Sequence, residues 1–236
     1  MNPELTRLAD IAEHSLYAAG PNASTVRYSF EIFARHLRGD SILELGAAEG
    51  VMTELLAGTG KSLTIVEGSG RFCESLRTRF PAASVRHSLF EDFKPESSFA
   101  NIILGHVLEH VLDPVDILSR ARRWLGNDGR VMAAVPNSRS LHRQAAVLMG
   151  LLPFEESLNE ADIHHGHRRV FNPETFRHCF REAGFAIEIF GGYWLKPVSN
   201  QQIESSWNPE MLAAFMKLGE RYPDIAGEIY VIARLP

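Results

Sequence analysis

The chain has 236 residues, of which 45% are hydrophobic and 22% charged, with a formal net charge of −5 and a pI of about 6.1. These values are ordinary for a globular protein and exclude extensive disorder. No run of Lys or Arg is long enough to predict a nucleic-acid-binding surface, so we expect no nucleic-acid partner.

The cysteines and the chain start indicate a compartment. Cys73 and Cys179 lie far apart and lack metal-ligand spacing, which favours a reducing cytoplasm over a disulfide framework. The first residues lack the basic-then-apolar order of a signal peptide, and no stretch approaches the roughly 20 apolar residues that span a bilayer. We therefore expect a cytoplasmic protein without a membrane partner. Nothing in the sequence indicates an oligomeric state.

Short apolar runs alternate with amphipathic segments through the first part of the chain. Residues 1–38 carry apolar residues at helical spacing, which predicts N-terminal helices. After them, the predicted strands are 41–45, 63–66, 83–86, 101–104 and 130–135, and the predicted helices are 51–57, 70–80 and 114–125. Buried parallel strands separated by helices give this alternation.

The remaining residues interrupt this pattern and then resume it. First come a helix at 141–151 and a polar, His-rich loop. They are followed by a helix at 173–183, a strand at 185–190, a helix at 209–221 and a strand at 228–233. We predict one doubly wound α/β domain with a mostly parallel, seven-stranded sheet. Its parts are an N-terminal helical lid (1–38), a cofactor-binding core (39–137), an acceptor-side insertion after the fifth strand (138–172) and the C-terminal part of the sheet (173–236).

One turn carries most of the functional information. The first predicted strand runs into small residues, from Gly46 to Gly50, and a helix follows. Small residues let the backbone approach a ligand, and the helix start offers unpaired N–H groups. Glu67 closes the next strand, where a carboxylate can accept hydrogen bonds from a ribose diol. The pattern predicts an adenosine-type ligand.

Two phosphate-containing ligands fit this turn poorly. A dinucleotide fingerprint requires glycine at three positions, and this chain has Gly46, Ala48 and Val51 there. A phosphate loop ending at Gly60 would need a glycine where Leu55 stands, and it would have to follow a strand. A ligand without phosphates fits better, and a turn that binds nothing is the remaining alternative.

Further motifs follow in order: Val107-Leu108-Glu109-His110-Val111, the segment Trp124 to Arg130, and Val135-Pro136-Asn137. Together with the turn and Glu67, they resemble the class I S-adenosylmethionine-dependent methyltransferases of the ubiquinone-biosynthesis type, over about residues 41–137. The resemblance implies S-adenosylmethionine as cofactor. It also implies a cofactor site made of Glu44, Gly46, Ala47, Ala48, Gly50, Glu67, Gly68, Ser88, Leu89 and His106.

This chain departs from the family pattern at three places. Ala48 replaces the middle glycine of the turn, which the family tolerates, and Ala100 replaces a mostly structural aspartate. Ser88 stands where the family commonly has an acid that contacts the adenine amino group. Ser88, Glu91 and Asp92 are therefore alternative adenine contacts.

Histidines are the candidates for catalysis. Methyl transfer is an in-line displacement, and a neutral acceptor also needs a base for its proton. His106 ends the fourth predicted strand, where the ligand crevice of this fold opens. It is either a general base or a wall of the cofactor pocket. His165 and His167 are the alternative bases.

The segment 162–169 and two tyrosines are candidates for the acceptor site. The histidine spacing matches no standard zinc pattern, so we expect no metal ion; a solvated surface is the alternative to a functional cluster. Arg143, Arg168 and Arg169 are predicted to hold a carboxylate or phosphate. The resemblance also places an aromatic near the sulfonium, for which Tyr17 and Tyr28 are candidates and core packing the alternative.

These observations predict methyl transfer to an oxygen or nitrogen atom of a small metabolite in a biosynthetic reaction. A sugar, an antibiotic intermediate or an acid would fit, with an anionic group as the feature that the arginines would recognise. The alternatives are methylation of a protein or RNA, and a non-catalytic adenosine-binding protein.

Overall fold

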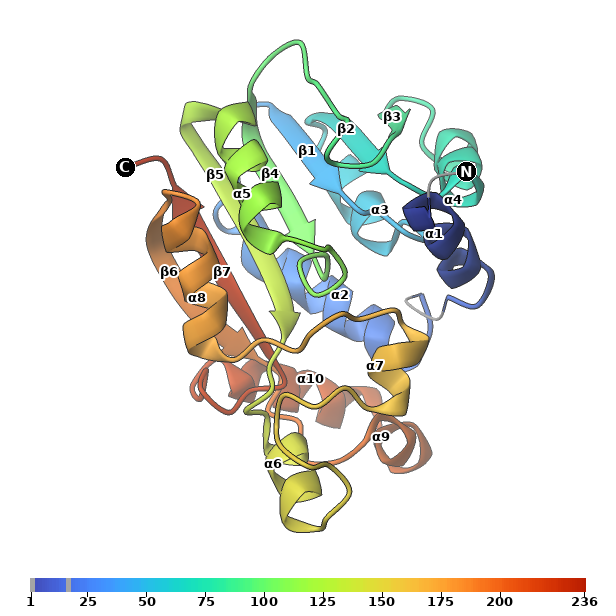
Figure 1. Ribbon diagram of the computed structural model, residues 1–236, viewed down its shortest axis with the longest axis vertical. Helices are drawn as coiled ribbons and strands as arrows, with labels where there is room; N and C mark the ends of the chain where they lie inside the picture. The colour runs from blue at the N-terminus through green and yellow to red at the C-terminus, as the bar shows by residue number, and fades with distance from the viewer. Residues whose placement is uncertain (1–2, 16–17) are drawn as a thin grey trace.

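The computed structural model describes residues 3–15 and 18–236. Its strands form one sheet in the order β3-β2-β1-β4-β5-β7-β6 (Figure 1). They are β1 Ser41–Leu45, β2 Ser62–Glu67, β3 Ser84–His87, β4 Phe99–Gly105, β5 Leu125–Pro136, β6 Ala186–Tyr193 and β7 Glu228–Arg234. The pairs from β3 to β5 are parallel, and β7 runs antiparallel to β5 and β6. This confirms the predicted doubly wound, mostly parallel, seven-stranded sheet.

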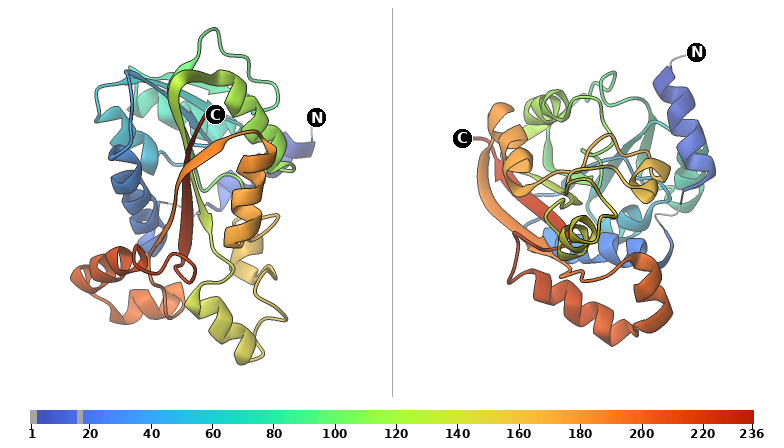
Figure 2. Two further views of the ribbon diagram at one scale, coloured as in Figure 1. Left: turned by 90° about the vertical axis from the view of Figure 1, so that its left-hand side faces the viewer. Right: turned by 60° about the horizontal axis from the view of Figure 1, so that its bottom comes forward.

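Helices cover both faces of this sheet. They are α1 Pro3–Glu13, α2 Gly20–Ala34, α3 Val51–Ala57, α4 Gly70–Arg79, α5 Pro114–Trp124, α6 Leu141–Leu148, α7 Glu160–His164, α8 Pro173–Glu182, α9 Asn200–Ser206 and α10 Pro209–Gly219. In the side view, α2 and α3 lie on one side of the sheet, and α5 and α8 on the other (Figure 2). Each layer has its own buried apolar cluster, which explains why the central strands are apolar on both faces.

Two short helices were not predicted. The structure has α7 inside the segment that we expected to be a loop, and α9 where no helix was expected. Both begin with a capping box, in which Asn159 pairs with Asp162 and Ser199 pairs with Gln202. Helices of five and seven residues contain too few apolar repeats for periodicity to reveal them, so only the caps signal them.

Left-handed backbone conformations gather where the parallel strands end. Gly46 has a φ of 72°, and a Cβ atom there would lie 2.9 Å from a methyl group of Val107. Ala48, with a φ of 45°, and His106, with a φ of 59°, adopt the same conformation without being glycine. Such residues cost on the order of 1–3 kcal/mol each and concentrate at functional sites.

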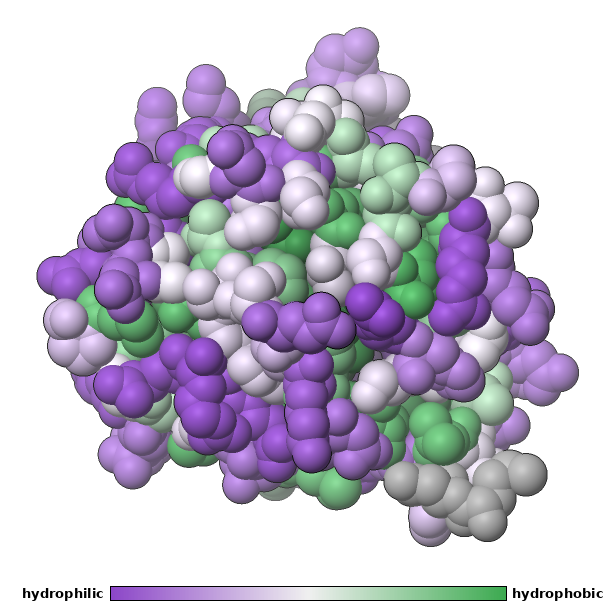
Figure 3. Space-filling view, turned by 90° about the horizontal axis from the view of Figure 1, so that it is seen from above, coloured by the Kyte–Doolittle hydropathy of each residue, from purple (hydrophilic) through white to green (hydrophobic). Residues whose placement is uncertain are grey.

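The opposite end of the molecule is polar. Seen from above, where the parallel strands begin, hydrophilic side chains cover most of the surface and leave only small apolar areas between them (Figure 3). Among the described helices, none combines the length and apolar character that crossing a membrane requires.

Candidate active site

The main cavity lies beyond the carboxyl ends of β1, β2 and β4. Its volume is about 1140 Å³, which includes its open mouth. Most of the predicted cofactor residues line it: Gly46, Ala47, Ala48, Glu67, Gly68, Ser88, Leu89 and His106. Glu91 also lies in this wall, so both it and Ser88 can face an adenine ring.

Glu67 is held at the floor of this cavity by backbone donors. Its carboxylate accepts hydrogen bonds from the Ala48 N–H at 3.1 Å and the Ser69 N–H at 2.8 Å. Burial raises the pKa of the Glu67 carboxyl, and these backbone bonds offset part of that rise. Because each carboxylate oxygen has a second lone pair, Glu67 can also accept bonds from a diol.

Glu44 and Gly50 were predicted to contact the cofactor, but they are not among the described residues of the cavity wall. The Glu44 side chain is 2% exposed and accepts a hydrogen bond from the Thr53 hydroxyl at 2.8 Å. Burial raises the pKa of Glu44 to about 8. Glu44 therefore ties β1 to α3 beneath the turn, while Gly50, with a φ of 81°, begins that helix.

Helix α1 covers one side of the main cavity. Glu4, Arg7, Leu8 and Ile11 all belong to its wall, and the Leu8 side chain packs directly against Gly68. Arg7 also donates a hydrogen bond to the Gly166 carbonyl, which links α1 to the segment after α7. Helix α1 lies within the predicted lid (1–38), and the lid itself stays a prediction.

A second, polar cavity of about 400 Å³ shares His106 and Val26 with the first. Polar side chains make up most of its wall: Asn22, Thr25, His106, Glu109, His165, His167 and Glu228. The structure therefore brings together the three histidines that were predicted as catalytic. The volume of about 400 Å³ includes open space at the mouth of this cavity.

His106 lies at the junction of the two cavities. Its Nε2 atom is 3.1 Å from the Tyr193 hydroxyl. Its Nδ1 atom is 3.7 Å from a Glu109 oxygen and 3.7 Å from a Glu228 oxygen. Burial lowers the pKa of the imidazole, but the two carboxylates outweigh it, so the pKa stands above its ordinary value. Burial also raises the pKa of Glu228, to about 7.

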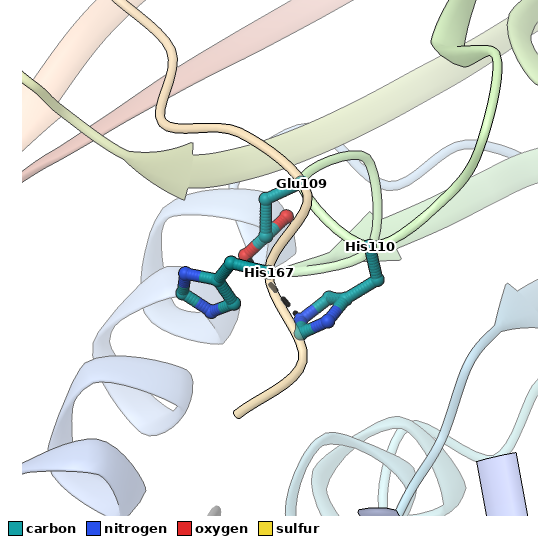
Figure 4. Close-up of side chains that lie close together, drawn as sticks. All are labelled: Glu109, His110 and His167. Atoms are coloured by element: carbon teal, nitrogen blue, oxygen red, sulfur yellow. Dashed lines mark ion pairs between the residues drawn. The ribbon is translucent and has the colours of Figure 1, made fainter. Parts of the chain in front are cut away.

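Glu109, His110 and His167 bring three ligand atoms within 4.8 Å of one another (Figure 4). Each ring already has a partner: His167 Nδ1 is 3.1 Å from Asp162, and His110 Nδ1 is 3.4 Å from the Gly166 carbonyl. The 3.9 Å between His110 Nε2 and Glu109 exceeds the about 3.3 Å between two ligands of a tetrahedral zinc ion. The two rings are therefore held by hydrogen bonds to groups other than Glu109, and the expected absence of a metal stays a prediction.

The three arginines predicted to hold an anion have structural partners instead. Arg143 is buried and binds Asp162 together with the carbonyls of Glu155 and Ser157. Arg168 binds Glu4 and the His110 carbonyl. Arg169 donates to the carbonyls of Leu108, Val111 and Leu112, and none of the three lines either cavity in the described part of the chain. Their guanidinium groups fix the loops around the site.

The tyrosine predictions have different outcomes. Tyr17 lies outside the described residues. The Tyr28 ring stacks on Tyr193 at 5.6 Å, and its hydroxyl donates to Glu220 at 2.5 Å. Tyr28 is therefore a packing residue, because its polar end points to Glu220 rather than into a cavity.

Sequence reasoning missed Glu109, Glu228 and Tyr193 as site residues. Glu109 lies inside a quoted motif, but its role there was not assigned. Glu228 is a charged residue at the start of an otherwise apolar strand, and that contrast is the one signal the sequence offered. Tyr193 carries no such signal, because tyrosine is common in strands.

Comparisons with known proteins agree with this geometry. The family described as a methyltransferase domain matches residues 22–188, and the chain belongs to that family. A ubiquinone biosynthesis O-methyltransferase of Xanthomonas euvesicatoria is 24% identical over 86% of this chain and 88% of its own length. A probable S-adenosylmethionine-dependent methyltransferase of Mycolicibacterium smegmatis is 22% identical over 67% of this chain, which spans only 57% of that protein.

Solved structures show the same fold. A possible histamine N-methyltransferase of Thermotoga maritima has a TM-score of 0.66 at 14% identity, covering 98% of this chain and all of that one. A glycopeptide N-methyltransferase complexed with S-adenosylmethionine has a TM-score of 0.58 at 14% identity, covering 88% of this chain and 86% of that one.

Arg143→Ala should destabilise the fold. It leaves the Asp162 carboxylate buried without its guanidinium, which should lower the free energy of unfolding by about 3–5 kcal/mol at neutral pH. Urea unfolding measures this. Arg139→Ala is the control, because its pair with Glu174 is exposed and should contribute at most about 1 kcal/mol.

The same variant has a defined pH dependence. Although burial acts to raise it, the folded-state pKa of Asp162 lies below the ordinary value, because His167, Asn159 and Arg143 stabilise the charge. The carboxylate therefore contributes stability above its unfolded pKa of about 3.9 and loses it as the pH falls. The difference in the free energy of unfolding between wild type and Arg143→Ala should therefore become smaller below about pH 4. If Arg143→Ala had the same free energy of unfolding as the wild type at neutral pH, the structural role of Arg143 would be contradicted, and its guanidinium could serve a ligand instead.

Proposed function

We propose that this protein transfers the methyl group of S-adenosylmethionine to an oxygen or nitrogen atom of a small molecule that enters the second cavity. The observation that carries the proposal is His106, which belongs to the walls of both cavities. A cofactor in the first cavity and an acceptor in the second would meet at this residue. S-adenosylmethionine supplies an electrophilic methyl group on a sulfonium when it is bound.

The first cavity suits this cofactor. Backbone turns at Gly46 to Ala48 leave room for a close approach, and Glu67 can accept hydrogen bonds from the ribose hydroxyls. Apolar side chains of Leu8, Leu89 and Phe90 belong to the same wall and could pack against an adenine ring. The matched family and the S-adenosylmethionine-dependent relatives support the same assignment.

His106 is the residue placed to remove the acceptor's proton. In one tautomer of His106, Nε2 carries the ring proton and donates a hydrogen bond to the Tyr193 hydroxyl. The Nδ1 atom then directs its lone pair toward the polar cavity. That tautomer can accept a proton from a hydroxyl or an ammonium group. Tyr193 is thus a positioning residue, because it acts through the orientation of His106.

The wall of the second cavity, which consists of a few mostly polar side chains, favours a small acceptor over a protein or RNA. The anionic acceptor considered from sequence loses its support, because the three arginines are engaged elsewhere. A non-catalytic adenosine-binding protein would have no use for a polar cavity beside the cofactor site.

Glu67→Ala should weaken binding of S-adenosylhomocysteine, the demethylated cofactor. Losing charge-assisted hydrogen bonds should cost on the order of 1.5–3 kcal/mol, or about tenfold or more in affinity. Calorimetry measures the affinity for S-adenosylhomocysteine. The control is Glu54→Ala on the exposed side of α3, which should leave that affinity unchanged. Equal affinity in wild type and Glu67→Ala would remove Glu67 from the site, and preferential binding of NAD would overturn the proposal.

His106→Gln should lower kcat by about 10²–10⁴-fold, because general-base catalysis contributes that much. Release of S-adenosylhomocysteine, with an acceptor that the wild type methylates, is the readout. The base must be neutral and its pKa is raised, so wild-type activity should rise with pH along a limb above about 6.5, and the variant should lack that limb.

The matched control is His178→Gln, because His178 is an exposed histidine on α8. It should leave both the rate and the pH limb unchanged. A loss of less than about tenfold in His106→Gln would show that positioning alone carries catalysis.

A further inference from the structure

Two carboxylates in the second cavity have buried oxygens without hydrogen-bond donors. The Glu109 side chain is 1% exposed, and neither of its oxygens has a hydrogen-bond partner. One oxygen of Glu228, whose side chain is 10% exposed, is in the same state. Burying a carboxylate without donors is costly, so a ligand that supplies donors to these oxygens would be stabilised.

The surroundings of these carboxylates do not balance their charge with a fixed cation. The described wall of the second cavity contains no Lys or Arg. The charge of Lys196 acts on Glu228, yet no ion pair within 4 Å joins the two residues. The Lys196 Nζ atom lies over the Trp194 ring, 4.7 Å from its centroid. Two histidines of this wall can carry a positive charge beside both carboxylates: His106, at 3.7 Å from each, and His167, whose charge lowers the pKa of both.

These features select among acceptors by charge. A carboxylate or phosphate would face the Glu109 carboxylate and a Glu228 that is partly ionised at neutral pH, since its pKa is about 7, and this disfavours binding. A hydroxyl group could donate one hydrogen bond but would leave the charge uncompensated. An ammonium group has three N–H donors and a positive charge, so it can satisfy both carboxylates at once.

We propose that the second cavity takes a protonated primary or secondary amine, anchored by Glu109 and Glu228 and methylated on its nitrogen. This rests on the proposed methyltransferase function and names its substrate class. It replaces the anionic acceptor inferred from the arginines with a cationic one inferred from the cavity wall.

The reaction balances without any further reagent. The bound ammonium gives one proton to His106, which frees a lone pair on nitrogen. That pair forms the new N–C bond to the methyl carbon as the C–S bond breaks and its electrons return to sulfur. The products are a methylated ammonium and neutral S-adenosylhomocysteine, and His106 then releases its proton to solvent.

Three compounds of one shape test the charge preference. 2-Phenylethylamine, 2-phenylethanol and phenylacetate share one carbon framework and differ in carrying a positive, a neutral and a negative polar end. Calorimetry on the wild-type protein loaded with S-adenosylhomocysteine should show the amine binding at least about tenfold more tightly than the alcohol. The acid should not bind measurably.

Two variants test whether Glu109 and Glu228 cause the preference for the amine. Glu109→Gln and Glu228→Gln keep the side-chain shape but remove the charge, and each should weaken amine binding by about tenfold or more. Affinity for S-adenosylhomocysteine should stay the same, because neither residue lines the first cavity in the described chain. Glu174→Gln on the exposed face of α8 is the control. Thermal unfolding of each variant separates loss of the site from loss of the fold.

The outcomes separate the two proposals. If the wild type fails to bind S-adenosylhomocysteine, the proposed function falls first. If it binds that molecule but binds the alcohol or the acid as tightly as the amine, or binds no amine at millimolar concentration, the amine proposal is overturned. Amine binding that is abolished by a chelator and restored by a divalent ion would also overturn it, because the carboxylates would then serve a metal.

Discussion

The contact between the His106 ring and the carboxylates of Glu109 and Glu228 is the interaction on which both cavities depend. His106 follows β4 directly, Glu109 lies three residues further, and Glu228 begins β7. Because β7 runs antiparallel to β5, its start reaches the edge of the sheet where the parallel strands end. The antiparallel edge thus supplies a carboxylate that a purely parallel sheet would place at the other end.

The backbone conformation of His106 is part of the same arrangement. A φ of 59° is strained for a histidine, so the surrounding contacts must hold it. Tyr193 fixes Nε2, and the carboxylates face Nδ1. In this left-handed backbone conformation, the His106 side chain lies at the junction of the two cavities.

Segments far apart in the sequence complete the site through buried polar contacts. The segment 162–169 would be a solvated loop by composition, but Arg143 and Asp162 form a buried pair that fixes it. Asp162 also binds the His167 ring, and Arg168 and Arg169 tie the segment to the carbonyls of 108–112. The arginines therefore shape the acceptor side without offering charge to an anion.

The core of the fold could be predicted from sequence because its signals are local. Apolar runs that alternate with amphipathic segments predicted the strands. The small residues before α3, together with Glu67 at the end of β2, predicted the cofactor site. His106, His165 and His167 were also identified, since topology places the first and composition marks the others. The anion site lost the support of its three arginines, because an arginine's partner is set by tertiary contacts that the sequence does not show. Glu228 was missed for a similar reason: its place in the site depends on the antiparallel position of β7, and the sequence left the strand order open.

A crystal structure of the wild-type protein with bound S-adenosylhomocysteine would show whether the two cavities meet at the reacting atoms. We expect the ribose hydroxyls to donate hydrogen bonds to Glu67 and the sulfur to face His106 at the mouth of the second cavity. A sulfur atom directed away from His106, toward the open side of the first cavity near Leu112, would contradict this expectation.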